Sequence, residues 1–339
     1  MAAYSGIFDL FGLREWCDES KKKSLMSLRQ LKGDDPAWWE IPFPSLDNLH
    51  KACAGIPQTR DFTAWLENGF LAIRPALRVV LDPLTQPLSW ALDGALTLFT
   101  TLPWWCLVPL ILVGTMLSSK SLRITAFVGA CFAFFLFTDH YGYAVQTLSI
   151  IFVCTVLCAI LGVPTGILMS KNDTAQRVIT PVLDMLQTLP TFVYLIPLIF
   201  LFKITEPKLY GLAIILYSIV PVIRLTNLGI RLVDRDVIEA ANAYGMTARQ
   251  KLVRVEFPLA LPNIMAGINQ TIMMALSMVV IASMIGVKGL GQPVLQAVTN
   301  QYFALGLFNG AAVVALAIVF DRVSHSYGSR IQKFRQVGE

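Results

Sequence analysis

The residues best suited to chemistry lie in a polar interval, Asp234–Pro262, between two long apolar runs. Asp236 is placed to accept hydrogen bonds from the first turn of a helix, and Glu239 three residues later completes a capping-box-like pair. Gly245 follows at the point where a helix end needs a left-handed residue. This spacing predicts a short helix that ends at a glycine hinge.

A second short helix is predicted after the hinge. Thr247 and Gln250 repeat the capping-box spacing, and Pro258 is expected to end this helix. Charged side chains around the hinge are expected to face water: Arg235, Glu239, Arg249, Lys251, Arg254 and Glu256. Small and apolar side chains are expected to pack: Ala240, Ala241, Leu252 and Val255. The interval therefore predicts a small, rigid, two-helix block between hydrophobic segments.

Motifs for phosphate binding and nucleophilic catalysis are missing from the sequence. The segment from Gly245 to Lys251 lacks the second glycine of a phosphate-binding loop, and GVKGLG at Gly286–Gly291 lacks its Lys and Ser/Thr. The three histidines are scattered and accompany no nucleophile motif: His50, His140 and His325. We therefore expect no enzyme activity, catalytic residue, metal site or cofactor in this chain, and any ATP to be used by a partner subunit.

The composition is that of a membrane protein. Hydrophobic residues make up 55% of the chain and charged residues only 14%, with a mean hydropathy of +0.61. The apolar runs are continuous and about 20 residues long, which suits helices crossing a hydrocarbon core rather than a barrel. The net charge of +5 lies in short loops and tails, so it indicates membrane orientation and not nucleic-acid binding. Four of the six cysteines lie in apolar runs, and we expect no disulfide framework.

Three regions are expected along this all-α chain. Residues 1–60 form a polar tail, and residues 61–94 form an amphipathic interfacial segment. Three prolines are expected to break that segment into pieces: Pro75, Pro83 and Pro87. Residues 95–339 form a polytopic membrane domain with about seven transmembrane helices. The predicted spans are Ala95–Leu117, Leu122–Thr138, Tyr143–Met169, Val182–Phe202, Tyr210–Ile230, Ile264–Gly286 and Phe303–Val323.

Lysines and arginines in short loops predict how these spans are oriented. One set of loops is basic, through the polar interval and through Lys120, Arg123, Lys171, Arg177, Arg330, Lys333 and Arg335. The opposite set holds few such residues: Lys203, Lys208 and Lys288. The basic set is expected on the cytoplasmic side. The polar interval and the C-terminus then lie inside and, with seven spans, the N-terminus lies outside.

The polar interval resembles the EAA loop of ABC importer permeases, whose form is E-A-A, three residues, G, nine residues and I-x-L-P. The matching residues are Glu239, Ala240, Ala241, Gly245, Val255 and Pro258, with Val255 in place of Ile and Phe257 in place of Leu. The resemblance implies the transmembrane domain of a type I ABC importer. It also implies that the interval forms coupling helices that dock in a cleft of a separate cytoplasmic ATPase subunit.

A second stretch is similar to a narrower branch of these permeases. Residues Thr180–Pro197 (TPVLDMLQTLPTFVYLIP) resemble a signature of the glycine betaine/proline betaine, ProW-like proteins, and Ala282–Gly286 and Gly289–Gly291 also fit that branch. The resemblance covers about Gly94 to Val323. It implies an inner-membrane permease for a quaternary-ammonium osmoprotectant.

Several polar and aromatic residues are candidates for the translocation pathway: Asp184, Gln187, Thr188, Pro190, Phe192, Tyr194 and Asn269. Asp184 and Gln187 are costly against lipid, so they are expected to face the bundle or a pore. For Asp184, a helix-end contact near the cytoplasm or an interhelical hydrogen bond is the alternative. Aromatic faces suit a trimethylammonium group, although core packing also explains Phe192 and Tyr194. Asn269 lines the pore or bridges helices.

Arg224 and the two prolines of the Thr180–Pro197 stretch have a structural interpretation. Arg224 is interpreted mainly as a snorkelling anchor at the inner end of its span. Pro190 and Pro197 are expected to kink or break their helix.

The expected partners are an ATPase dimer inside, a betaine-binding protein outside, a second copy of the chain and the lipid bilayer. Three alternatives remain open. The same machine could carry choline, carnitine, proline or another amino acid. The chain could be an ion-driven secondary carrier or channel with Asp184 as its coupling site, or it could be a structural scaffold.

Overall fold

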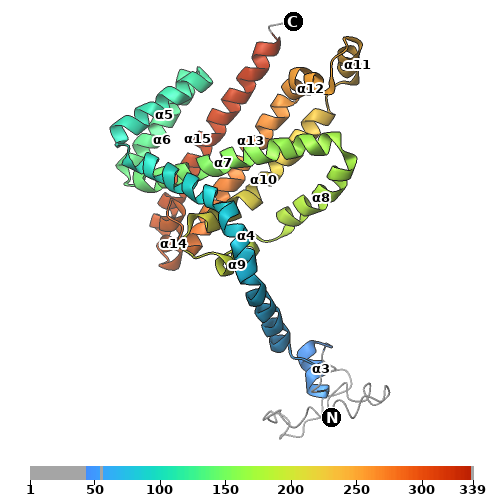
Figure 1. The fold of residues 1–339 in the computed structure, drawn as a ribbon. Helices are drawn as coiled ribbons and strands as arrows, with labels where there is room; N and C mark the ends of the chain where they lie inside the picture. The colour runs from blue at the N-terminus through green and yellow to red at the C-terminus, as the bar shows by residue number, and fades with distance from the viewer. Residues whose placement is uncertain (1–42, 54–55, 337–339) are drawn as a thin grey trace. The chain divides into compact units, whose positions relative to one another are not determined.

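A computed structural model describes residues 43–53 and 56–336, and within these ranges every regular element is a helix (Figure 1). The all-α prediction is confirmed. The chain divides into two compact units, Met1–Val79 and Val80–Glu339. Most of the predicted polar tail, residues 1–42, lies outside the described residues.

The first unit contains a short helix, α3 (Leu46–Ala52), which begins at a serine cap. The Ser45 hydroxyl accepts a hydrogen bond from the Asn48 N–H at 3.3 Å. Asp47 accepts one from the Thr59 N–H at 2.9 Å. Cys53, which ends this helix, is disulfide-bonded. The expectation of no disulfide framework did not foresee this bond at Cys53.

Helix α4 (Thr59–Thr101) continues through all three of its internal prolines. The prediction that these prolines break the segment is wrong. Each proline removes one N–H donor and crowds the preceding turn, and a 43-residue helix keeps its remaining hydrogen bonds through such local defects. The helix ends instead beside Pro103, where α5 (Trp104–Ser119) starts at an angle of 110°. The predicted straight span Ala95–Leu117 is thus two bent pieces.

The remaining helices follow in chain order, and most coincide with predicted spans. They are α6 (Leu122–Phe137), α7 (Tyr141–Lys171), α8 (Asp173–Thr188), α9 (Thr191–Leu201), α10 (Pro207–Arg231), α11 (Arg235–Ala243), α12 (Ala248–Lys251), the π-helical turn η3 (Leu252–Glu256), α13 (Phe257–Ala282), the 3-10 turn η4 (Ser283–Ile285), α14 (Gly291–Thr299) and α15 (Phe303–Gln336). Helix α14 was not expected from the sequence.

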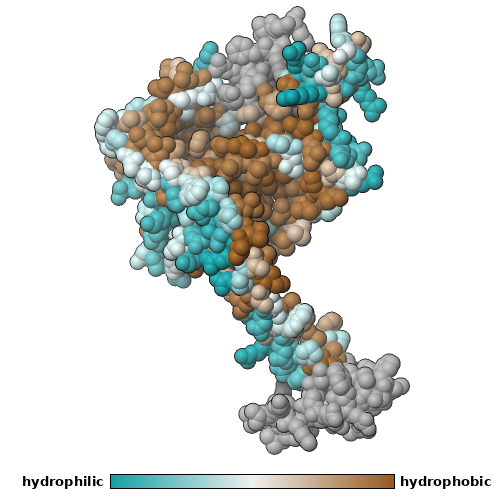
Figure 2. Space-filling model, in the orientation of Figure 1, coloured by the Kyte–Doolittle hydropathy of each residue, from teal (hydrophilic) through white to brown (hydrophobic). Residues whose placement is uncertain are grey.

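Among the described residues, four helices are long and apolar enough to cross a membrane, and six if each of two bent pairs forms one span. The bent pairs are α4 with α5 and α8 with α9, and α6 is a shorter apolar helix. Apolar side chains cover the middle of the visible face of the second unit, and hydrophilic ones gather over α11 and the α7–α8 turn (Figure 2). The multi-pass membrane architecture is confirmed, while the count of seven spans stays a prediction.

Helices α7, α10 and α13 form the centre of the second unit, and they approach one another at glycines. A Cβ added at Gly166 of α7 would lie 2.6 Å from Thr226 Cβ and 2.7 Å from the Ile223 carbonyl oxygen of α10. A Cβ at Gly267 of α13 would lie 3.0 Å from the Val222 Cα of α10. Small residues of this kind let helix backbones pack closely within a membrane. The three helices therefore pack as a rigid group.

The segment after α13 is fixed to α7 by a further close contact. Gly289 has a φ of 149°, and a Cβ there would lie 2.6 Å from Thr147 Oγ1. The Leu290 N–H donates a hydrogen bond to that hydroxyl at 2.8 Å. A glycine is therefore required at position 289, because a side chain would displace the hydrogen bond that orients α14.

Gly166→Ala should destabilise the protein, because the neighbouring carbonyl oxygen belongs to a helix backbone and cannot rotate away. We expect the free energy of unfolding to fall by about 1–3 kcal/mol, as for overpacked cores. Thermal unfolding of the detergent-purified protein measures it. The matched control is Gly142→Ala in the same helix, which meets no atom within 4 Å. Equal midpoints for the two variants would contradict the close-packing assignment.

Candidate functional site

The polar interval folds as a two-helix block whose first helix begins two residues earlier than expected. Asp234, not Asp236, caps α11, and its carboxylate accepts a hydrogen bond from the Asp236 N–H at 3.0 Å. The predicted cap is wrong because the backbone already turns into the helix at Arg235, which leaves Asp236 in the first turn. An acidic residue there still faces the positive end of the helix dipole.

The hinge between the two helices has the predicted geometry. Gly245 has a φ of +70°, its N–H donates to the Asn242 carbonyl at 2.9 Å, and the Met246 N–H donates to the Ala241 carbonyl at 3.2 Å. These two bonds define a Schellman motif, which satisfies the last carbonyls of α11. The capping box of Thr247 and Gln250 at the start of α12 is also confirmed.

The second helix of the block does not end at Pro258. Helix α12 passes into the π-helical turn η3, which passes directly into α13, so residues Ala248–Ile285 form one continuous helical segment. Pro258 lies inside this continuous segment, directly after the π-helical turn, where the regular hydrogen-bond ladder is already interrupted and a missing N–H is accommodated as a local defect. The predicted stop is therefore wrong.

Glu256, expected to face water, is only 1% exposed. Its carboxylate forms an ion pair with the Nζ of Lys171, the last residue of α7. The expectation failed because it assumed α-helical spacing, whereas the π-helical turn adds a residue before Glu256 and changes the direction in which it points.

The block presents a mixed surface to its surroundings. Ala241 is buried, Glu239 and Ala240 are exposed, and Val255 and Pro258 are half-buried. Tyr244, next to the hinge, is 85% exposed. Several apolar side chains on or beside the block are also exposed: Leu232, Val237 and Val253. Exposed aromatic and apolar groups on a rigid, otherwise polar element are typical of a protein-docking surface.

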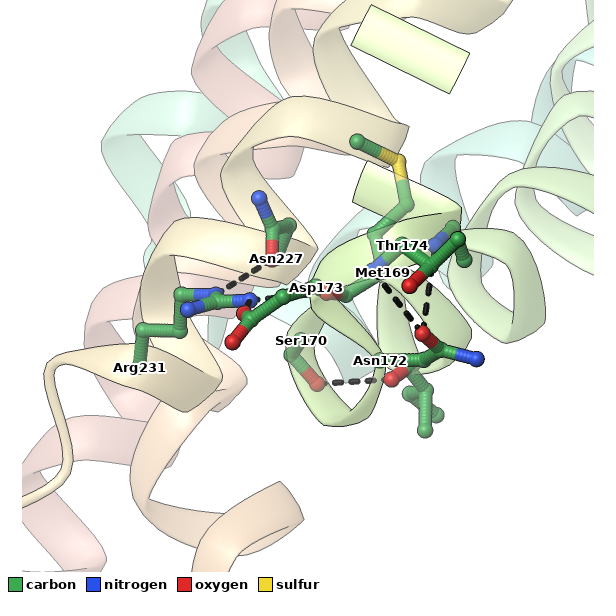
Figure 3. A network of polar contacts seen from close by, with 9 residues as sticks. Met169, Ser170, Asn172, Asp173, Thr174, Asn227 and Arg231 are labelled. Atoms are coloured by element: carbon green, nitrogen blue, oxygen red, sulfur yellow. Dashed lines mark hydrogen bonds and ion pairs between the residues drawn. The ribbon is translucent and has the colours of Figure 1, made fainter. Parts of the chain in front are cut away.

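The α7–α8 turn is held to the end of α10 by a polar network, in which Figure 3 shows Arg231 reaching across to Asp173. Arg231 donates hydrogen bonds to Asp173 Oδ1 at 2.6 Å, to the Met169 carbonyl at 3.0 Å and to Asn227 Oδ1 at 3.1 Å. Asn172 caps α8 by accepting from the Thr174 N–H at 2.9 Å. Sequence reasoning missed this network because it used the basic loop residues only for orientation.

The stretch carrying most pathway candidates is bent sharply at the predicted place. Helices α8 and α9 meet at 98° across Leu189–Pro190, which confirms the break at Pro190. Pro197 lies within α9, which continues to Leu201. The α8 side of the bend carries Gln187 and Thr188, both exposed.

Asp184 pairs with Arg224 of α10, and both side chains are about half-exposed. The interpretation of Arg224 mainly as a snorkelling anchor is therefore incomplete, because its guanidinium is bound to a carboxylate. The guanidinium and the carboxylate thus join α8 to α10 through a charge-assisted contact. The alternative of an interhelical contact for Asp184 describes this geometry.

The other candidates lie on two helices, α9 and α13. Phe192 of α9 is exposed, whereas Tyr194 is buried and its hydroxyl has no hydrogen-bond partner among the described residues. Asn269 of α13 donates to Asp321 Oδ1 of α15 at 3.1 Å, so it bridges two helices. The Asn269 Oδ1 and the Thr271 hydroxyl are buried and unpartnered within the described part of the chain. Asp321 was missed, although a carboxylate inside a long apolar run was a signal for it.

The geometry can be compared with known proteins. The family model described as binding-protein-dependent transport system inner membrane component matches residues 159–333. The chain is 40% identical over 233 residues to the glycine betaine transport system permease protein OpuAB of Bacillus subtilis, covering 68% of this chain and 76% of that protein. It is 36% identical over 293 residues to the glycine betaine/proline betaine transport system permease protein ProW of Escherichia coli, covering 84% and 78%.

Two further similarities agree with these. The glycine betaine/carnitine transport permease protein GbuB of Listeria monocytogenes is 38% identical over 253 residues, covering 73% of this chain and 88% of that protein. The structure is similar to that of a chain of the MetNI methionine ABC transporter in an inward-facing conformation, with a TM-score of 0.51. The two sequences are 18% identical, and the similarity covers 55% of this chain and 92% of that chain. The last shows a shared fold.

Gly245→Val should disturb the hinge, because a β-branched residue resists a φ of +70°. A strain of 1–2 kcal/mol predicts that the ATPase coupling implied by the EAA resemblance falls by about tenfold. Membrane insertion should be normal, since a Cβ at this glycine meets no atom within 4 Å. The control is Gly245→Asn, which tolerates the left-handed region and should retain most coupling. Full coupling in the valine variant would contradict the hinge assignment.

Proposed function

The chain belongs to the family of binding-protein-dependent transport system inner membrane components, and we propose that it imports glycine betaine, proline betaine or a related quaternary-ammonium osmoprotectant with energy from ATP. It is a multi-pass inner-membrane permease with the fold of a type I ABC importer subunit. The observation that carries the substrate is that glycine betaine appears in the names of all three relatives described above.

The energy source follows from the polar block. A sequence without a phosphate-binding loop supports the proposal that ATP is hydrolysed by a separate subunit. The rigid hinge at Gly245 and the exposed side chains around Tyr244 suit docking of a cytoplasmic ATPase. Glu239 is exposed on the same block and is available to a basic group of that partner. A second copy of this chain completes the pore, and an extracytoplasmic binding protein delivers the solute.

The proposed orientation puts the polar block and the C-terminus in the cytoplasm and the N-terminus outside. The distribution of lysine and arginine among short loops supports it. The disulfide at Cys53 supports it independently, because disulfides persist in oxidising compartments outside the cytoplasm. A cytoplasmic N-terminus would place this disulfide in a reducing environment.

The translocation pathway is proposed to pass the bend between α8 and α9. Tyr194, Asn269 and Thr271 each carry a buried polar atom without a partner among the described residues. Such atoms are costly unless water, a solute or a second chain satisfies them. The exposed ring of Phe192 offers a face to a trimethylammonium group.

Transport in reconstituted vesicles tests the energy source. The chain is reconstituted with the ATPase and the binding protein expected from neighbouring genes, and uptake of radiolabelled glycine betaine is measured. We expect uptake of glycine betaine when ATP is supplied on the side of the membrane where the ATPase is bound. We expect no uptake when only a sodium or proton gradient is applied. Gradient-driven uptake without the ATPase would overturn the proposal. Competition by unlabelled proline betaine, choline, carnitine and proline ranks the solutes.

Asp184→Asn separates the ATP-driven permease from an ion-coupled carrier. A half-exposed ion pair contributes at most about 1 kcal/mol, so ATP-driven uptake should fall by no more than about fivefold. The exchange variant Asp184→Arg/Arg224→Asp should recover part of that loss. In an ion-coupled carrier that uses Asp184, the single variant would abolish coupling to the gradient. Complete loss of uptake in Asp184→Asn, without rescue by the exchange, would favour that carrier.

A further inference from the structure

The polar block, residues Asp234–Pro262, which we propose as the coupling block, is attached to a part of the chain that is distant in sequence. Glu256, at the end of η3, is almost fully buried and pairs with Lys171 at the end of α7. A carboxylate is costly to bury unless a cation accompanies it. Lys171 therefore compensates the buried negative charge of Glu256, and removing Lys171 would leave that carboxylate inside the protein without a cation.

An apolar cluster lies beside this ion pair and joins the same elements. Its buried members are Ile230 of α10 and Ala260 and Ile264 of α13. Side chains from α7, from η3 and from α13 pack against them: Val163, Ile167, Leu252, Phe257 and Ile268. The ion pair and the cluster together hold the start of α13 against the last turns of α7.

The opposite end of the coupling loop is tied to the same place. The loop leaves α10 at Arg231, whose guanidinium bonds to Asp173 and to the Met169 carbonyl (Figure 3). It returns to the membrane helices at Glu256, which is bound to Lys171. The residues that flank the loop on both sides thus bind one five-residue stretch, Met169–Asp173. Movement of the block must either carry this stretch along or break these contacts.

That stretch is the junction between α7 and α8, and α8 leads to the bend at Pro190. We propose that Lys171 and Glu256 are positioning residues that transmit movement of the coupling block to α8 and hence to the pathway. The proposal rests on the proposed ATP-driven import. It adds a route through α7 and α8, which are not continuous in sequence with the block, to the direct chain connections of the block to α10 and α13.

The test compares solute transported per ATP hydrolysed in the reconstituted complex. Lys171→Gln and Glu256→Gln keep the size of the side chains and remove one charge each. We expect each to lower the ratio by about tenfold, a usual size for coupling between sites, while the ATPase still hydrolyses ATP. The exchange variant Lys171→Glu/Glu256→Lys should recover part of the ratio. Lys120→Gln is the control, because Lys120 is an exposed lysine at the end of α5 and should change nothing.

Several outcomes would overturn the proposal. A purely structural role predicts less folded protein or a lower unfolding temperature with an unchanged ratio of solute to ATP. An unchanged ratio in both single variants, or no recovery in the exchange variant, would also exclude transmission through this pair. Wild-type complex that takes up no solute with ATP would instead refute the proposed import, so the two failures are distinguishable.

Discussion

The close approach of α10 to α7 and α13 is the constraint on which the rest of this structure depends. Gly166 and Gly267 leave no room for side chains at the two contacts, so the three helices keep a fixed spacing. In a membrane, helices gain little from excluding water, and close van der Waals packing takes over that role. The polar block and the bent α8–α9 pair are both attached to this group. The block and the α8–α9 pair therefore move relative to one rigid group, formed by α7, α10 and α13.

Helices, their approximate ends and the hinge were predictable because each depends on local chemistry. Gly245 adopts a positive φ and Thr247 caps the following helix, since both outcomes follow from a few neighbouring residues. The break at Pro190 has the same origin. The family, too, was identified from a spacing within one loop.

The failures share a different cause. Glu256 was assigned to water because an α-helical repeat was assumed, and one π-helical turn reversed its environment. Pro258 and the prolines of α4 were expected to end helices, but the helices continue through them. In a long helix the loss of one backbone hydrogen bond at a proline is a local defect that the neighbouring turns accommodate. Contacts such as Asn269 with Asp321 join residues 52 positions apart. No local pattern encodes which distant partners the packing brings together.

The continuity of α12, η3 and α13 has a mechanical consequence. The 38-residue segment Ala248–Ile285 is, at 1.5 Å per residue, about 57 Å long and starts in the polar block. If α13 tilts together with α7 and α10, a tilt of only about 5° would displace its far end by about 5 Å over that length. Such leverage needs no unfolding and no flexible joint between the block and the membrane. The displacement at the far end of α13 is thus set by the length of the helical segment.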